Sequence, residues 1–229
     1  MITFEHVTKR FQNGAYGLRD VSFDLQAGEL AFLTGHSGAG KSTLLRLILM
    51  LEKATRGQVL VNGRNLGRTA PRYAPQVRRQ IGMIFQDHKL LSDKTVFDNV
   101  ALPLMIAGMR YGDIRKKVRA ALDKVGLLRK EKSWPLMLSG GEQQRVGIAR
   151  AIVSMPPILL ADEPTGNLDP DLSRELFGLF RQLNSQGVTV LIASHDLALI
   201  RSMGCRVLVL SEGSLVDDIS AAEIAGSAA

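Results

Sequence analysis

Residues 35–43 read GHSGAGKST, which matches the pattern of a phosphate-binding loop. A short apolar run at residues 30–34 comes directly before the loop and predicts a buried strand. Residues 42–51 follow, are rich in leucine and predict a helix. A loop that joins a strand to a helix presents backbone N–H groups and the positive end of the helix dipole to an anion. The sequence therefore predicts an α/β fold with a nucleotide-phosphate site.

Every position of this loop is expected to take part in nucleotide binding. Glycine lets the backbone approach the phosphates, Lys41 is expected to contact the β- and γ-phosphates, and Ser42 is expected to ligate Mg²⁺. A glycine-rich turn without a ligand is the alternative, and the flanking strand and helix disfavour it. The expected binding residues are Gly35, His36, Ser37, Gly38, Ala39, Gly40, Lys41, Ser42 and Thr43.

Residues 158–163 read ILLADE, an apolar run that ends in two acidic side chains. The run predicts a buried strand with Asp162 and Glu163 at its carboxyl end, where α/β sheets bind their ligands. We expect Asp162 to hold Mg²⁺, directly or through water, and Glu163 to orient and deprotonate an attacking water. Two acids on a surface turn are the alternative, which the preceding apolar run disfavours.

Residues 138–144 read LSGGEQQ and predict the start of a capped helix. Ser139 is the expected N-cap and Glu142 lies three residues further on, which is the spacing of a capping box. Gly140 and Gly141 leave the N–H groups of the helix start open to an anion. The local pattern alone fits a plain helix cap equally well, and only the full string favours an anion site.

The composition limits the classes of protein that this chain can belong to. It has 229 residues, 45% of them hydrophobic, and a formal net charge of +7, which favours anionic partners such as nucleotide phosphates, acidic lipid or nucleic acid. Its single cysteine, Cys205, excludes a disulfide framework or a zinc site and fits a reducing compartment. No signal-peptide pattern opens the chain, and its apolar runs are far shorter than the roughly 18 residues of a spanning helix. A membrane role would need another chain.

The chain is expected to form a single domain, residues 1–229, with a core from residues 1–86 and 145–229. Strand-like patterns within residues 2–25 predict an antiparallel sheet at the N-terminus. Residues 87–144 lack strand signals and predict an inserted helical subdomain that includes the LSGGEQQ segment.

Two patterns in the chain locate helices more closely. Residues 113–125 have apolar positions at helical spacing, and residues 96–104 hint at a second helix that Pro103 interrupts. Later in the chain Asp169 is expected to cap a helix that Gly187 closes.

Together the three motifs resemble the ATP-binding subunits of ABC systems, and the resemblance covers almost the whole chain. It implies an ABC-type P-loop NTPase core with an antiparallel β subdomain and a helical subdomain. It also implies that the LSGGEQ segment of one subunit contacts ATP held by the phosphate loop of another. The ATP-bound form would then be a head-to-tail homodimer that holds two ATP molecules. The residues expected to act on the neighbour are Ser139, Gly140, Gly141, Glu142, Gln143 and Asp169.

The resemblance implies further roles for individual residues. Gln86 is similar to the glutamine that ligates Mg²⁺, senses the attacking water and couples to a membrane partner. Residues 167–169, which include Asp169, are similar to the segment that crosses to the neighbouring subunit. His195, directly after an expected core strand, is similar to the histidine that contacts the γ-phosphate. Glu163, His195, Lys41 and Gln86 are the expected catalytic residues.

An aromatic side chain is expected to stack on the adenine ring. Phe11 lies where the family often has a tyrosine, and it keeps the π-face that stacking needs. Tyr16 is a competing candidate, and a place in the core is the alternative for Phe11.

Further strings indicate a branch of the family. Residues 161–169, ADEPTGNLD, are typical of a subgroup that includes lipoprotein-releasing, macrolide-efflux and cell-division ATPases. His36 and residues 81–88, followed by Leu90 and Leu91, resemble the cell-division branch. That resemblance implies an integral membrane partner, further division proteins and a place at the division septum, on the cytoplasmic face of the inner membrane. It implies control of peptidoglycan hydrolysis and no nucleic-acid partner.

Other functions remain open at this point. The chain is also compatible with the ATPase of a lipoprotein-releasing or efflux transporter. A soluble ABC protein that acts on ribosomes or DNA is disfavoured, because the chain has one ATPase domain and no sustained heptads between Thr43 and Leu138. A scaffold that binds ATP without turnover is disfavoured by the presence of Glu163 and His195. The apolar positions expected to receive the membrane partner, or else to form core, are Leu90, Leu91, Val96, Phe97 and Met105.

Overall fold

The computed structural model describes residues 1–166 and 168–226 of the chain. Asn167, which the sequence places in the segment that crosses to the neighbouring subunit, and residues 227–229 lie outside the described residues. Among the helices of the described part, none combines the length and the apolar character that crossing a membrane requires.

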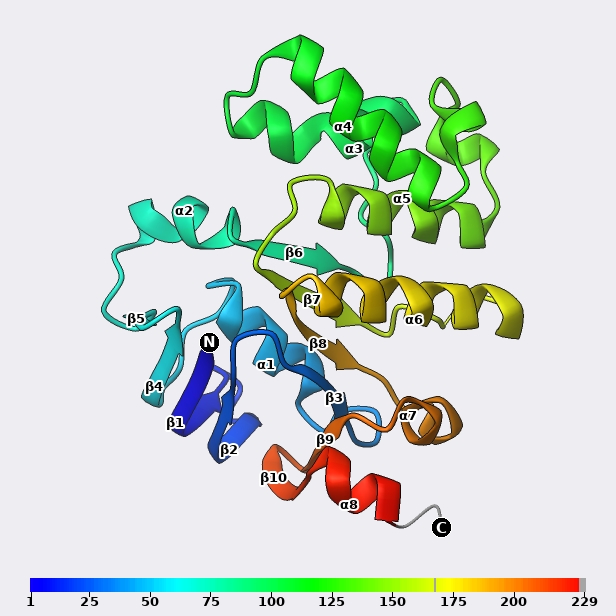
Figure 1. Cartoon of the computed structure of the whole chain (residues 1–229). Helices are drawn as coiled ribbons and strands as arrows, with labels where there is room; N and C mark the ends of the chain where they lie inside the picture. Colours follow the sequence, from blue (N-terminus) through cyan, green and yellow to red (C-terminus); the bar gives the residue numbers. More distant parts are fainter. Residues whose placement is uncertain (167, 227–229) are drawn as a thin grey trace. The chain divides into compact units, whose positions relative to one another are not determined.

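Contacts divide the described chain into two compact units, whose elements Figure 1 labels. The first unit combines Met1–Arg78 with Arg181–Ala229, and the second is Arg79–Phe180. The predicted helical subdomain, residues 87–144, falls inside the second unit, which also contains two strands. The subdomain boundaries themselves stay a prediction.

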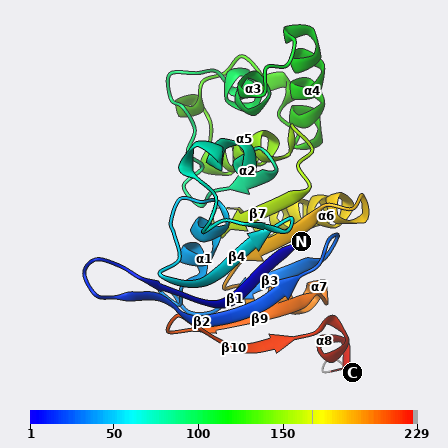
Figure 2. The same ribbon diagram turned by 90° about the vertical axis from the view of Figure 1, so that its left-hand side faces the viewer.

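An antiparallel sheet opens the first unit (Figure 2). Its strand order is β2-β1-β4-β5, and the alternating pattern of the first two strands buries one of their faces. Phe4 and Phe23 stack across these strands with their ring centroids 4.8 Å apart. The predicted N-terminal sheet is therefore present, with two further strands that the sequence analysis did not predict. The strands are β1 (Ile2–Arg10), β2 (Tyr16–Leu25), β4 (Arg56–Val61) and β5 (Arg64–Asn65).

A second set of strands in this unit carries the phosphate loop. β3 pairs in parallel with β8 and with β9, and β9 pairs antiparallel with β10. Every residue of β3 and β8 is buried, as expected for parallel strands that are covered on both faces. The strands are β3 (Leu30–Thr34), β8 (Thr189–Ala193), β9 (Arg206–Ser211) and β10 (Ser214–Ile219).

The helix after the phosphate loop, α1 (Lys41–Ile48), ends three positions before the predicted residue 51. Met50 has a left-handed backbone with φ of 53°, which is incompatible with a continuing helix. The guanidinium of Arg78 donates to the carbonyl oxygens of Leu49 and Met50, at 2.9 and 3.0 Å. A cation thus satisfies carbonyls at the helix end and stabilises this stop. The other helices of the unit are α2 (Ala74–Arg78), α7 (Leu197–Met203) and α8 (Ala221–Gly226).

The second unit combines a parallel strand pair with a group of helices. β6 (Ile81–Ile84) pairs in parallel with β7 (Ile158–Asp162). Three helices pack together near them: α3 (Val96–Ile106), α4 (Tyr111–Lys124) and α5 (Gly140–Ile152) (Figure 1).

A longer helix, α6 (Pro170–Ser185), begins in the second unit. Asp169 caps its start as predicted, because its Oδ1 accepts hydrogen bonds from the N–H groups of Asp171 and Leu172. Gly187 follows the helix end with φ of 91°.

Pro103 does not interrupt α3, contrary to the prediction. An interior proline costs a helix about 3 kcal/mol, so other interactions must hold the helix together. The buried side chain of Asn99 donates to the carbonyl oxygens of Leu91, Lys94 and Thr95. Three apolar side chains of the helix are also fully or almost fully buried, and tertiary packing therefore overrides the local penalty. They are Val96, Val100 and Leu104.

Candidate active site

Two glycines fix the course of the phosphate loop between β3 and α1. Gly35 has φ of 146° and Gly40 has φ of 110°, values that favour glycine. A Cβ atom on Gly35 would lie 2.2 Å from the backbone oxygen of Leu210, and one on Gly40 would lie 2.5 Å from that of Gly17. The loop backbone is thus wedged against β9 and β2, and no larger residue fits at either glycine without a shift.

Lys41 bends back over this loop. Its side chain is 8% exposed, and its Nζ donates to the carbonyl oxygens of Gly35 and His36 at 2.7 and 3.3 Å. A buried ammonium needs such partners, because an uncompensated buried charge is costly. The loop therefore already holds a cation beside the backbone that is expected to surround the phosphates.

Phe11 lies beside the end of the phosphate loop, whereas the ring of Tyr16 packs against Arg19. A Cβ atom on Gly17 would lie 2.8 Å from the ring of Phe11 and 2.8 Å from the Cγ2 of Thr43. Both side chains therefore touch the same glycine of β2. The ring of Tyr16 instead has the guanidinium of Arg19 at 4.3 Å from its centroid. This geometry favours Phe11 over Tyr16 as the aromatic residue next to a nucleotide.

The second acidic residue lies in a strained turn. Residues 158–161 are fully buried in β7, Asp162 ends the strand half-buried, and Glu163 follows it. Glu163 has φ of 46° and precedes Pro164, although a proline disfavours helical conformations in the residue before it. Backbone strain of this kind costs about 1–3 kcal/mol and clusters at active sites. The outlier therefore marks Glu163 as a functional candidate.

The LSGGEQQ segment forms the predicted capping box at the start of α5. Ser139 Oγ accepts from the N–H of Glu142 at 3.3 Å, and Glu142 Oε2 accepts from the N–H of Ser139 at 3.0 Å. A hydrogen bond from Lys130 lowers the pKa of the Glu142 carboxyl, and the bond from the Ser139 N–H adds to this. A Cβ atom on Gly140 would meet nothing within 4 Å, so the first turn of the helix is open.

The sequence does not single out Lys130, because it lies 12 positions before Glu142 and outside the capping pattern.

The remaining candidate residues follow the ends of paired strands. Leu33 lies opposite Ala193 in the β3–β8 pair, so the phosphate loop and the exposed His195 follow the same sheet edge. Ile84 lies opposite Ala161 in the β6–β7 pair, so the exposed Gln86 and the acidic turn follow one edge as well. Each unit thus collects its own candidates at the carboxyl ends of its parallel strands, where α/β sheets bind ligands.

A family model described as ABC transporter matches residues 18–166, which include the phosphate loop, the LSGGEQQ segment and the acidic turn. The chain belongs to the ABC transporter family. Within the family, it is 59% identical over 215 residues to the cell division ATP-binding protein FtsE of Escherichia coli strain K12, covering 94% of this chain and 97% of that one. It is 48% identical over 219 residues to FtsE of Mycobacterium tuberculosis strain H37Rv, covering 95% of both chains.

Solved structures of the family agree with the fold. A dimeric bacterial ABC transporter cassette has a TM-score of 0.92 and 35% identity, covering 96% of this chain and 99% of that chain. A dimeric post-hydrolysis state of a cassette bound to ADP and Pi has a TM-score of 0.92, 34% identity and the same coverage. The predicted ABC-type fold class is thereby confirmed.

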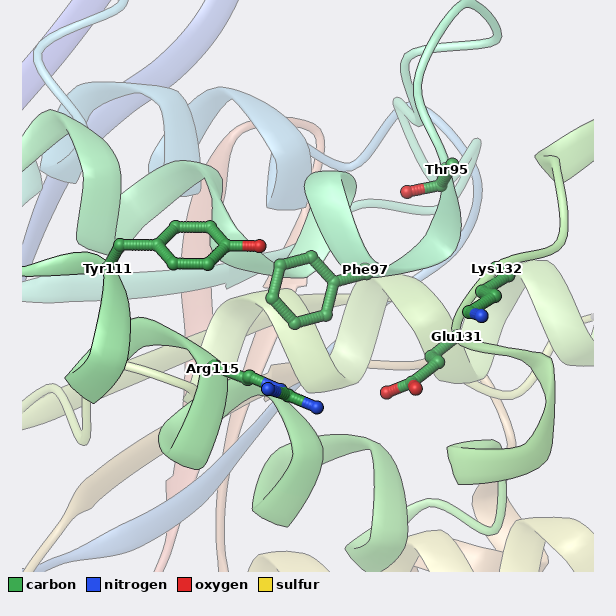
Figure 3. Close-up of a pocket in the computed structure, with 6 residues that line it drawn as sticks. All are labelled: Thr95, Phe97, Tyr111, Arg115, Glu131 and Lys132. Atoms are coloured by element: carbon green, nitrogen blue, oxygen red, sulfur yellow. The ribbon is translucent and has the colours of Figure 1, made fainter.

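A cavity in the second unit is lined by Phe97, one of the five apolar residues expected to receive a membrane partner (Figure 3). Its volume is about 300 Å³, and the rings of Phe97 and Tyr111 point toward each other in it. Tyr111, which the sequence did not single out, is 72% exposed, whereas the expected partner residue Val96 is fully buried. Of the other expected positions, Leu91 and Met105 are exposed. The cavity is lined by Thr95, Phe97, Tyr111, Arg115, Glu131 and Lys132.

Proposed function

We propose that this chain is the ATP-binding and ATP-hydrolysing subunit of an FtsEX-type cell-division complex. The observation that carries the proposal is the set of phosphate loop, acidic turn and capped signature helix in a chain with high identity to FtsE proteins. ATP is the substrate, and the proposed binding residues are those of the loop at residues 35–43 together with Phe11. The proposed catalytic residues are Glu163, His195, Lys41 and Gln86.

The donor set of the site fits Mg²⁺. This ion prefers hard oxygen ligands, keeps several waters, and is usually held by one or two carboxylates together with substrate phosphates. Ser42, Gln86 and Asp162 offer a hydroxyl, an amide oxygen and a carboxylate, which is a set of that kind. When bound, the ion would neutralise charge on the phosphates.

Hydrolysis needs positioning and charge neutralisation more than covalent chemistry by the protein. In the proposed step, the oxygen of a water attacks the γ-phosphorus while the bond from that phosphorus to the leaving ADP oxygen breaks. Glu163 accepts the proton of the water, and His195 and Lys41 contact the γ-phosphate. Gln86 positions the water and the ion. The products are ADP and phosphate.

A second copy of the chain completes each site in this proposal. The exposed first turn of α5 offers backbone N–H groups and a helix dipole to the γ-phosphate on the neighbour. Asp169 lies at the start of α6 and acts at the same boundary. Dimeric cassettes with closely similar folds support this arrangement.

We propose an FtsX-type integral membrane protein as the partner, docked at the cavity beside Phe97 and Tyr111. ATP-driven pairing would then move this partner to control peptidoglycan hydrolysis at the septum, with the ATPase on the cytoplasmic face of the inner membrane. Tagged full-length chain purified from membranes is expected to recover an FtsX-type protein, because no spanning helix is found in its own described part. Recovery of a lipoprotein-releasing or efflux permease in its place would contradict the division role.

A matched pair of variants locates the docking site in the same experiment. Phe97→Asp is expected to lose the partner and to keep ATP binding. Tyr73→Asp, at an aromatic residue that is 39% exposed in the first unit, is expected to keep both.

Substitution of Phe11 is expected to weaken ATP binding while substitution of Tyr16 is not. Stacking of a base on an aromatic ring is worth about 1–3 kcal/mol, so Phe11→Ala should raise the Kd for ATP by roughly 5- to 150-fold. Phe11→Tyr should keep the affinity because it keeps the ring. Titration calorimetry with Mg-ATP measures both, and Tyr16→Ala is the control. A larger loss in Tyr16→Ala than in Phe11→Ala would reverse the assignment.

A further inference from the structure

One side chain of α5 joins two loops of the second unit that are far apart in sequence. Gln144 is 2% exposed, and its Nε2 donates to the carbonyl oxygen of Pro164 at 2.8 Å. Its Oε1 contacts the Nδ1 of His88, which lies 56 positions away. Both ends of this buried amide are therefore used, one on the loop after Gln86 and the other on the turn after Glu163.

The direction of these bonds follows from the chemistry of the partners. The carbonyl oxygen of Pro164 can only accept, so the NH₂ group of Gln144 must face it. The amide oxygen then faces His88, whose Nδ1 must carry a hydrogen and donate it. The bridge therefore requires a donor at this position of residue 88.

A second side chain of α5 holds the same loop by its backbone. His88 and Lys89 have φ of 56° and 48°, two successive left-handed residues that are not glycine. The guanidinium of Arg150 donates to the carbonyl oxygen of His88 at 2.5 Å and to that of Lys89 at 2.7 Å. Arg150 is half-buried, and this burial lowers the pKa of its guanidinium. The loop conformation is thus fixed from α5 at two carbonyls and one imidazole.

The other end of the bridge lies next to the strained residue of the acidic turn. Pro164 directly follows Glu163, whose left-handed backbone is disfavoured before a proline. The hydrogen bond from Gln144 restrains the peptide group between Pro164 and Thr165, one residue after Glu163. Ser139 caps the same helix five residues earlier.

We propose that Gln144 is a positioning residue that, through His88 and Pro164, links the loop after Gln86 to the turn that carries Glu163. The proposal rests on the proposed function, in which Gln86 positions the attacking water and Glu163 accepts its proton, and on the expected coupling of Gln86 to the membrane partner. A displacement of the loop changes the restraint on Pro164 and so the placement of the catalytic carboxylate. The helix that carries Gln144 also begins at the LSGGEQQ segment. Closure of the ATP-bound dimer on that segment would therefore also act on the link from His88 through Gln144 to Pro164.

His88→Asn and His88→Asp form a matched pair that tests the link. The two side chains have the same size and both tolerate a left-handed backbone. Asn keeps an N–H donor near the position of Nδ1, whereas Asp places an acceptor against the amide oxygen of Gln144. We expect His88→Asn to keep the wild-type kcat, and His88→Asp to lose roughly 10- to 100-fold in kcat with KM for ATP nearly unchanged, as small misplacements of catalytic groups do.

Hydrogen exchange of the full-length chain supplies a readout that does not depend on turnover. His88→Asp and Gln144→Met are expected to speed exchange in residues 162–168, and His88→Asn is expected to leave it at the wild-type rate. Equal exchange in this segment for His88→Asp and wild type would overturn the link. If the wild type binds ATP without hydrolysing it, the proposed function fails, while the exchange result still decides whether the bridge exists.

Discussion

Glu163→Gln is expected to lower ATP turnover by roughly 10²- to 10⁴-fold, the usual contribution of a general base, and to leave ATP binding intact. Glutamine has almost the size of glutamate and keeps an oxygen toward the water, but it does not accept the proton. On the proposed function, the γ-phosphate that bridges the two subunits would then persist. The variant should therefore accumulate as an ATP-bound dimer. Phosphate release and light scattering with Mg-ATP measure the two effects.

Glu212→Gln is the matched control for this experiment. Glu212 also has a left-handed backbone, with φ of 48°, but it lies exposed in the turn between β9 and β10. It should turn over ATP like the wild type and should not trap a dimer. Normal hydrolysis by Glu163→Gln would remove Glu163 from its role as the base.

Ser139→Arg is expected to abolish hydrolysis while the ATP affinity of the dilute monomer stays close to that of the wild type. The new side chain places bulk and charge on the open first turn of α5, where the neighbour's phosphates are proposed to bind. Loss of the cap itself costs only about 1 kcal/mol and should leave the fold intact. Calorimetry on dilute protein and phosphate release at high protein concentration separate the two properties.

A second capping box provides the control. Ser220 Oγ accepts from the N–H of Glu223 at 3.3 Å, and Glu223 accepts in return from the N–H of Ser220 at 2.7 Å. Ser220→Arg removes an equivalent cap outside the signature and should keep hydrolysis. A large loss of ATP affinity in monomeric Ser139→Arg would mean that the signature acts on its own chain.

Mixing experiments test directly whether each subunit completes the active site of the other. Ser139→Arg keeps its phosphate loop, and Lys41→Ala keeps its signature. A mixed dimer of the two therefore contains one intact composite site, and the mixture should regain part of the activity that each variant lacks alone. No recovery would argue against head-to-tail completion.

Features that depend on near neighbours in the sequence were predictable. The phosphate loop needs two glycines with positive φ between a buried strand and a helix, and all of these signals lie within residues 30–51. The capping box at Ser139 and the cap at Asp169 each join residues three positions apart, so their patterns are equally local. The strand that ends at Asp162 is apolar because parallel strands are covered on both faces.

Features that depend on residues far away in the sequence were not predictable. The persistence of α3 through Pro103 depends on the packing of its apolar face against α4 and α5, which nothing near Pro103 in the sequence shows. Gln144 reads only as part of the signature string until the fold brings His88 and Pro164 to its two ends. A polar residue at a position that helical periodicity would assign to the buried face is the only local signal of such a bridge.

The absence of a side chain at Gly17 has a consequence for the choice of ligand. The ring of Phe11 and the methyl group of Thr43 lie against the same glycine, so the residues proposed to bind the base and the phosphates are held at a fixed spacing. On the proposed function, this spacing would match the length of the ribose that joins the base to the phosphates. Inorganic triphosphate gains nothing from the aromatic ring, and a free base gains nothing from the loop. The proposed selectivity for a whole nucleoside triphosphate would then depend on the absence of a side chain at Gly17.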